Sequence, residues 1–221
     1  MRILIINPNT SSDMTELIGH AARACARQPH GIRAINSDSG PEAIQGAEDG
    51  ERALPGLFQV FDREVVQGQT CDAVIIACFD DTGLWALRER SPVPVIGIGE
   101  AGYQVAMLLG ERFSVVTTLP VSVPVLEKNI ADYGFAARCA RVRASRVPVL
   151  KADDDQSYGR IAAEVGAAFD EDDVQSVVLG CAGMANLAER LTMTFQRPVV
   201  DGVVAAVGLS ETVLATLRGL K

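Results

Sequence analysis

The chain has 221 residues, of which 48% are hydrophobic and 22% charged, and its formal net charge is −8. This length and composition are typical of a globular protein with a sizeable core, in one large or two small domains, and the negative charge disfavours nucleic acid and anionic membranes as partners. No apolar run approaches the roughly 18 to 20 residues that span a bilayer, and the amino-terminal residues lack a signal-peptide pattern, so a cytoplasmic protein is expected.

Side chains suited to metal or cofactor chemistry are scarce. The histidines are His20 and His30, and the five cysteines form no CxxC pair, which disfavours a zinc site and a disulfide framework. No lysine ends an apolar strand, and no complete glycine-rich phosphate-binding motif opens a helix. We therefore expect chemistry carried out by side chains alone, with no metal and no cofactor.

Apolar β-branched runs alternate with helical patterns along the first half. The expected elements are a strand at 2–6, a helix from about 12 to 27 capped by Ser11 or Ser12, a strand at 32–36, a helical segment over 42–67 broken or kinked at Pro55, a strand at 72–78, a helix around 84–87 and a strand at 92–97.

The same alternation continues in the second half. The expected elements are a helix at 100–110, strand 113–118, helix 123–133, an exposed strand within 138–150, a helix after the acidic loop 151–157, strand 175–181, a helix over 184–191, strand 198–200 and a helix at 203–217. Strands that alternate with helices predict βαβ units and parallel sheets.

The two halves repeat. Asn7 and Thr117 end matching strands, Cys78 matches Cys181, and the run at Pro94 matches the run at 198–200; these pairs are separated by 110, 103 and 104 positions. The repeat predicts two similar α/β domains, each a three-layer, flavodoxin-like unit with a parallel sheet, related by an approximate twofold axis. Because ligands bind beyond the carboxyl ends of parallel strands, we expect the active site in the cleft between the domains.

Cys78 and Cys181 each follow an apolar strand. Inversion of a carbon next to a carbonyl needs a base on one face and an acid on the other, and a thiolate and a thiol from two equivalent halves would supply both. A free thiol has a pKa near 8.5, and the start of a helix, predicted after each cysteine, would lower it. The alternative is that both are small buried hydrophobic residues.

Polar groups near the cysteines are candidates for binding substrate. They are Asn7, Thr10, Ser11, Thr117 and Thr118, with the backbone amides at Phe79-Asp80 and Ala182-Gly183. Turn and cap chemistry is the alternative for the strand ends. Phe79 is either a wall of the pocket or part of the core. Asp80 is expected to cap the following helix with Asp81 or Thr82, unless its carboxylate points inward.

The chain resembles the aspartate/glutamate racemase superfamily, and more closely its hydantoin/allantoin racemase branch. The segments that carry the resemblance are Ile5-Ile-Asn-Pro-Asn-Thr-Ser11, Ala77-Cys-Phe-Asp-Asp-Thr-Gly-Leu84, Pro94-Val-Ile-Gly-Ile-Gly-Glu-Ala101, Phe113-Ser-Val-Val-Thr-Thr118, Leu179-Gly-Cys-Ala-Gly-Met-Ala185 and Pro198-Val-Val-Asp-Gly-Val203. Cys78 and Cys181 match the family's catalytic cysteines. Two departures are the Asp80-Asp81-Thr82-Gly83 segment, where the family usually has Gly-Asp-Pro-Gly, and the 47–52 segment, where it is more aromatic.

The resemblance implies a cofactor-independent isomerase that inverts C5 of 5-substituted hydantoins or of allantoin, so the expected partner is a small cyclic ureide. It also implies a homo-oligomer and a final helix that returns to the first domain, giving domains at 1–97 with 204–221 and at 98–203. The alternatives are an amino-acid racemase, a maleate-isomerase-like or an arylmalonate-decarboxylase-like enzyme, or a two-lobed ligand-binding protein without catalytic activity. A one-cysteine decarboxylase has no need of the second cysteine.

Overall fold

A computed structural model describes residues 1–217. The first half of the chain contains β1 (Ile3–Asn7), α1 (Ser12–Cys25), η1 (Pro29–Gly31), β2 (Ile32–Asn36), α2 (Ala47–Phe61), the π-helix η2 (Asp62–Gln67), β3 (Ala73–Ile76), α3 (Leu84–Arg90) and β4 (Val95–Gly97).

The second half begins with α4 (Ile98–Leu109), which follows the last strand of the first sheet in the sequence and precedes the first strand of the second. The elements that follow are β5 (Phe113–Thr117), η3 (Pro120–Ser122), α5 (Val123–Asp132), β6 (Cys139–Ala144), η4 (Val149–Lys151), α6 (Asp155–Glu171), β7 (Ser176–Gly180), η5 (Ala182–Met184), α7 (Ala188–Phe195), β8 (Val199–Asp201) and α8 (Gly202–Leu217).

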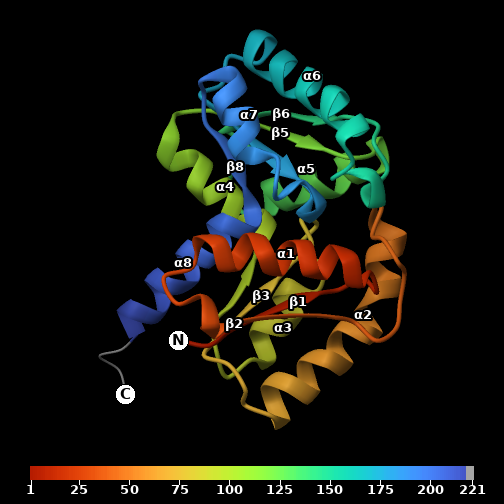
Figure 1. The fold of residues 1–221 in the computed structure, drawn as a ribbon, viewed down its shortest axis with the longest axis vertical. Helices are drawn as coiled ribbons and strands as arrows, with labels where there is room; N and C mark the ends of the chain where they lie inside the picture. Colours follow the sequence, from red (N-terminus) through yellow and green to blue (C-terminus); the bar gives the residue numbers. More distant parts are fainter. Residues whose placement is uncertain (218–221) are drawn as a thin grey trace.

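The predicted repeat is confirmed in the strand order. The first sheet runs β2-β1-β3-β4 and the second β6-β5-β7-β8, with every pairing parallel. Figure 1 shows the two sheets one above the other, with helices on their faces. Two parallel α/β sheets of the same topology are the fold that the alternating strands and helices predict.

The first sheet is covered on both faces because its strands are apolar on both. Ile3 and Ile5 pack in the core layer that contains α1, whereas Leu4 and Ile6 pack in the layer that contains α2 and α3. Successive side chains of a strand point to opposite faces, so a continuous apolar run produces a three-layer unit.

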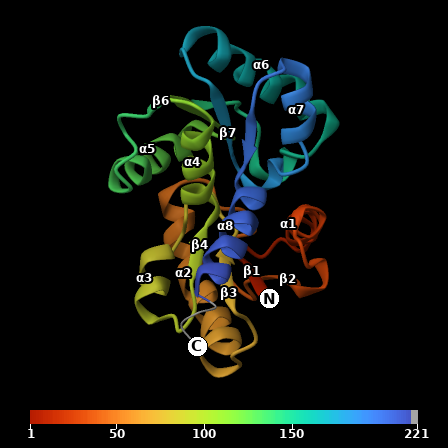
Figure 2. The same cartoon turned by 90° about the vertical axis from the view of Figure 1, so that its left-hand side faces the viewer.

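Two helices connect the halves. After β4, α4 packs against β5 and β7 of the second sheet; after β8, α8 packs against α1 and contacts β3 and β4 of the first. Figure 2 shows α4 and α8 side by side between the sheets. The proposed domain at 1–97 with the helix 204–221 has its last residues, 218–221, outside the described part of the chain.

The structure differs from the predicted elements near Pro55. A helical segment from residue 42, broken or kinked at Pro55, was expected. Instead α2 begins after Gly46, whose φ is 96°, and Pro55 does not break it into two helices. The proline ring lies on the exposed face, while Ala53, Gly56 and Leu57 are buried. Packing of that buried face therefore outweighs the hydrogen bond that proline cannot donate.

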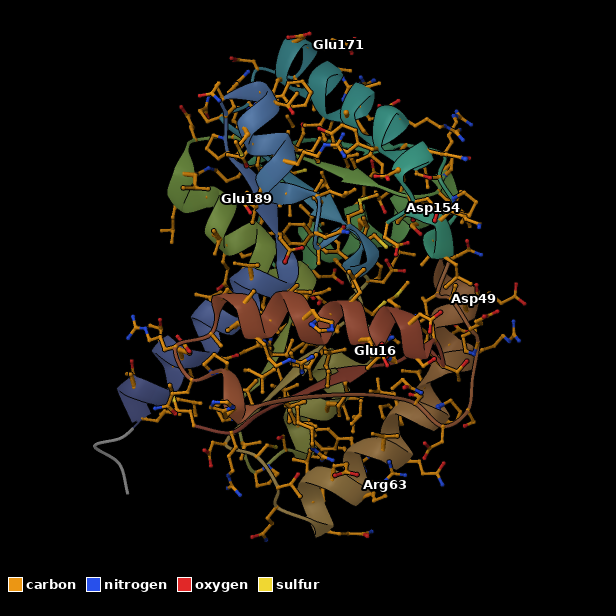
Figure 3. All side chains as sticks on the ribbon, viewed as in Figure 1. Glu16, Asp49, Arg63, Asp154, Glu171 and Glu189 are labelled. Atoms are coloured by element: carbon orange, nitrogen blue, oxygen red, sulfur yellow. The ribbon has the colours of Figure 1, made fainter. Side chains whose placement is uncertain are left out.

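The halves also meet at the start of α2, away from α8. Figure 3 labels Asp49, in the first turn of α2, and Asp154, just before α6, on the same side of the molecule. The Asp49 carboxylate accepts the backbone N–H of Gln45 at 3.2 Å, and the Gln45 side-chain oxygen accepts the N–H of Val149 at 3.5 Å. No helix within residues 1–217 is both long and apolar enough to cross a bilayer.

Candidate active site

The two cysteines lie where neighbouring strands of each sheet end together. The helices that follow β1 and β3, α1 and α3, lie on opposite faces of the first sheet. In the second sheet, α5 and α7 follow β5 and β7 and also lie on opposite faces (Figure 2). Open α/β sheets form a crevice where the connections diverge in this way. Cys78 lies two residues beyond β3, and Cys181 directly follows β7. A narrow cavity of about 30 Å³ lies there, and both cysteines line it.

The cavity is built from both halves of the chain. Its lining residues are Asn7, Asn9, Met14, Ile44, Ala77, Cys78, Phe79 and Asp80 from the first half, and Thr117, Thr118, Ser122, Val149, Gly180, Cys181 and Ala182 from the second. Strand ends supply the two cysteines, whereas Ile44, Ser122 and Val149 come from connecting segments. A ligand held here would therefore contact both halves at once.

Most of the predicted contact residues come together. Asn7, Phe79, Asp80, Thr117, Thr118 and Ala182 all line the cavity. Phe79 is a cavity wall and also a core residue, because it is 3% exposed and packs edge-on against Tyr103. Their roles towards a substrate stay predictions.

Three predicted residues lie beside the cavity without lining it. Thr10 donates its backbone N–H to the carbonyl of Pro41 at 3.1 Å, and Ser11 caps α1 by accepting the N–H of Met14 at 3.2 Å. Gly183 contributes its backbone N–H, which favours the thiolate form of Cys181. Ser11 thus carries out the cap chemistry that its position before the helix indicates.

A hydrogen-bonded group holds the end of β1 in place. The Asn7 side chain donates to Asn9 Oδ1 at 2.7 Å and to Thr15 Oγ1 at 3.0 Å, and its own oxygen accepts the Asn9 N–H at 3.3 Å. At the equivalent end of β5, the Thr117 hydroxyl donates to the Gly180 carbonyl at 2.9 Å. Buried side chains whose polar atoms are paired in this way give the cavity a fixed floor.

Both thiols are held in their neutral form. Burial raises the pKa of Cys181 to about 12, and burial together with the Asp80 carboxylate raises the pKa of Cys78 well above its ordinary value. The expected lowering by a helix start is wrong for Cys78, because turns occupy 79–83 and α3 begins only at Leu84. Loss of water around a thiolate outweighs the nearby donors.

Those donors are arranged alike at the two cysteines. The backbone amide two residues on, at Asp80 or Gly183, favours the thiolate. The carbonyl of each cysteine also accepts an N–H three residues on, from Asp81 or Met184, and both distances are 3.0 Å. The local turn is therefore repeated along with the strands.

The acidic pair after Cys78 does not cap the following helix, contrary to the expectation. Asp80 lines the cavity, and burial raises the pKa of its carboxyl to about 7. The charge of this carboxyl acts on both thiols. Asp81 instead reaches α4, where its carboxylate accepts the N–H groups of Gly99 at 3.0 Å and Glu100 at 2.7 Å. It also accepts the Tyr133 hydroxyl at 2.8 Å, so it joins the first half to the residue that follows α5 in the second.

Sequence reasoning missed Thr82 as part of the site. Its hydroxyl donates to Cys78 Sγ at 3.4 Å and lowers the pKa of that thiol, against the larger effect of burial. A polar residue four positions after a cysteine was the available signal. Asn9 belongs to the same turn as Asn7, but Ile44, Ser122 and Val149 lie in segments whose pattern gives no sign of the cavity.

Known proteins share both the sequence and the fold. The profile of the Asp/Glu/hydantoin racemase family matches residues 3–209. A hydantoin racemase from Rhizobium meliloti is 41% identical over 216 residues, covering 97% of this chain and 89% of that protein.

Solved structures give the same result. The allantoin racemase of Klebsiella pneumoniae has a TM-score of 0.92 at 39% identity, covering 98% of this chain and 88% of that one. The allantoin racemase of Pseudomonas fluorescens has a TM-score of 0.91 at 37% identity, with coverage of 98% and 92%. The chain therefore belongs to the Asp/Glu/hydantoin racemase family and is an enzyme of the isomerase class.

Proposed function

We propose that the protein inverts the C5 centre of 5-substituted hydantoins or of allantoin by a two-base mechanism that uses Cys78 and Cys181. The observation that carries this proposal is that equivalent strands of two equivalent sheets deliver one thiol each to a single cavity. Relatives named as hydantoin and allantoin racemases support the substrate class.

In one direction Cys78 first releases its thiol proton to solvent while the cavity is open. The resulting thiolate then takes the C5 proton, so the C–H bond breaks, an S–H bond forms, and the electron pair moves onto the ring carbonyl. The Cys181 thiol then gives its proton to the opposite face of C5. The opposite enantiomer uses the two residues in the reverse order. Donors around the cavity, among them the backbone amides of Phe79 and Ala182, stabilise the enolate oxygen.

The thiols suit this chemistry because each is held neutral by burial yet has donors for its charged form. A cavity of about 30 Å³ admits only a water-sized body, and a cyclic ureide is larger. Substrate entry thus requires the cavity to widen, and its closure around the substrate excludes water from the enolate.

The test is to incubate the protein with enantiopure allantoin and with alkyl and aryl hydantoins in deuterated water, following optical rotation and C5 deuteration. Cys78→Ser and Cys181→Ser, made separately, should each lose racemisation, with residual exchange limited to one enantiomer. Cys25→Ser alters an exposed cysteine outside the cavity and serves as the control. Full racemisation by either site variant would refute the two-base mechanism, and no exchange with any substrate would refute the proposed function.

A further inference from the structure

The Asp80 carboxyl has no hydrogen-bond partner among the described residues, 1–217. Within residues 1–217, three buried side-chain oxygens lack a hydrogen bond: Ser37 Oγ, Asp80 Oδ2 and Tyr103 Oη. Of these three residues, Asp80 is the one that lines the cavity shared by the two cysteines. A buried acceptor is normally paired, and an unpaired one is costly, so this oxygen requires an explanation.

The backbone around Asp80 is held from the opposite half of the molecule. The Asn129 side chain, on α5, donates to the Asp80 carbonyl at 2.7 Å. Together with the turn that begins at the Cys78 carbonyl, this contact fixes where the Asp80 side chain starts. The backbone of Asp80 is therefore held in place at the cavity wall.

Comparison of the two halves shows that the residue two positions after the cysteine needs no side chain to stabilise the thiolate. Asp80 and Gly183 each lie two residues after a cysteine, in turns with the same hydrogen bond and with amides that favour the thiolate. Gly183 does this without a side chain. The Asp80 carboxylate even opposes the chemistry, because its charge raises the pKa of both thiols.

A carboxyl that the thiols do not need, and that is unpaired among residues 1–217, is free to hydrogen-bond a ligand. Among the residues of the described chain that line the cavity, Asp80 is the only one with a carboxyl group; the others are apolar, neutral or thiol-bearing. Ring N–H groups occur in every cyclic ureide and can be bound by neutral oxygens such as those of Thr118 and Ser122. The carboxyl is thus available to the group that differs between substrates, the substituent on C5.

We propose that Asp80 determines specificity by accepting an N–H from the C5 substituent, so that the site selects ureides with a ureido group at C5, as in allantoin, over those with an alkyl or aryl group. This proposal rests on the proposed function. A substituent without N–H groups leaves the desolvated carboxyl unpaired, and sites built to hydrogen-bond a ligand strongly reject analogues that lack the bonding group.

The test compares allantoin with 5-isobutylhydantoin, whose branched four-atom substituent has the shape of the ureido group but no N–H. Rates of C5 deuteration give kcat/KM for each substrate with the wild type, Asp80→Asn and Asp80→Gly. The wild type should favour allantoin by roughly tenfold to a hundredfold, the effect of one charge-assisted hydrogen bond. Asp80→Gly reproduces the residue of the second half and should abolish most of that preference, with Asp80→Asn in between.

The ratio of the two rates does not depend on the fraction of folded enzyme, so a destabilised variant still gives a result. A wild type that prefers 5-isobutylhydantoin, or a ratio within threefold of wild type in Asp80→Gly, overturns the role of Asp80 and leaves the proposed function intact. Absence of exchange with both substrates in the wild type overturns the inference, and absence across the whole hydantoin panel overturns the proposed function.

Discussion

Replacement of Asp80 by asparagine should stabilise the protein, and increasingly so as the pH rises. The pKa of this carboxyl is about 7 in the folded protein because of burial, against 3.8 in the unfolded chain. Between these values the folded state binds the proton more tightly than the unfolded state does, so stability falls as the pH rises from about 4 towards 7. Asparagine has nearly the same shape and does not titrate.

The size of the effect follows from the difference in pKa. At 1.36 kcal/mol for each pKa unit, the charged form of Asp80 destabilises the fold by at most about 4 kcal/mol above neutral pH. Asp80 keeps partial contact with solvent as a residue, although its Oδ2 atom is buried. We therefore expect Asp80→Asn to gain about 2 kcal/mol in free energy of unfolding between pH 5 and pH 8 relative to the wild type.

Urea denaturation of the wild type and of Asp80→Asn at pH 5 and pH 8 measures this gain. Groups that titrate in both proteins contribute equally to the two free energies of unfolding, so their contributions cancel in the difference. Asp72→Asn is the matched control. Asp72 pairs with Arg2 at 3.0 Å and its pKa is lowered, so it is ionised at both pH values and its replacement should have the same effect at each. A change in stability for Asp80→Asn that is equal at pH 5 and pH 8 would show that the carboxyl is not desolvated.

Two further results are expected from residues that touch the site. Thr82→Val removes the donor to Cys78 Sγ and should lower kcat/KM about tenfold. Both enantiomers should be affected equally, because the equilibrium constant between them is one. Thr82→Ser should restore the rate, and a valine variant with unchanged kcat/KM would exclude a role for the hydroxyl. Tyr133→Phe removes the hydroxyl that Asp81 accepts at 2.8 Å and should reduce the free energy of unfolding by about 1–2 kcal/mol in urea. In Asp81→Asn, that same loss should become smaller, and an unchanged loss would mean that the two residues are not coupled.

The sheets and the paired cysteines could be predicted because their signals are local. Strand patterns have a period that burial dictates, and the match of Cys78 with Cys181 needs only the order of landmarks along the chain. Because both sheets have the same order, a residue after β3 and one after β7 occupy equivalent places. The repeat therefore made it possible to predict, from local patterns alone, that the two cysteines lie in one cleft.

The directions of the side chains after Cys78 could not be predicted in the same way. Two adjacent aspartates look the same in the sequence, yet Asp81 has a φ of 49° and reaches α4, while Asp80 lines the cavity. The partners of Asp81 lie 18 and 19 positions further along, and its third partner, Tyr133, belongs to the other half. Such contacts depend on how the halves approach, which no short pattern encodes.

The course of α8 has a consequence for how the protein is made. This helix follows all eight strands, yet it packs beside β3, β4 and α1, and its Glu211 accepts the N–H of Arg27 at 2.8 Å. A ribosome that adds roughly 5 to 20 residues per second takes on the order of 5 to 20 s to pass from residue 98 to residue 202. During that interval the first sheet is complete and α1 covers part of one face, but β3 and β4 lack the helix that packs beside them on that face, so the first half cannot close until α8 has been made.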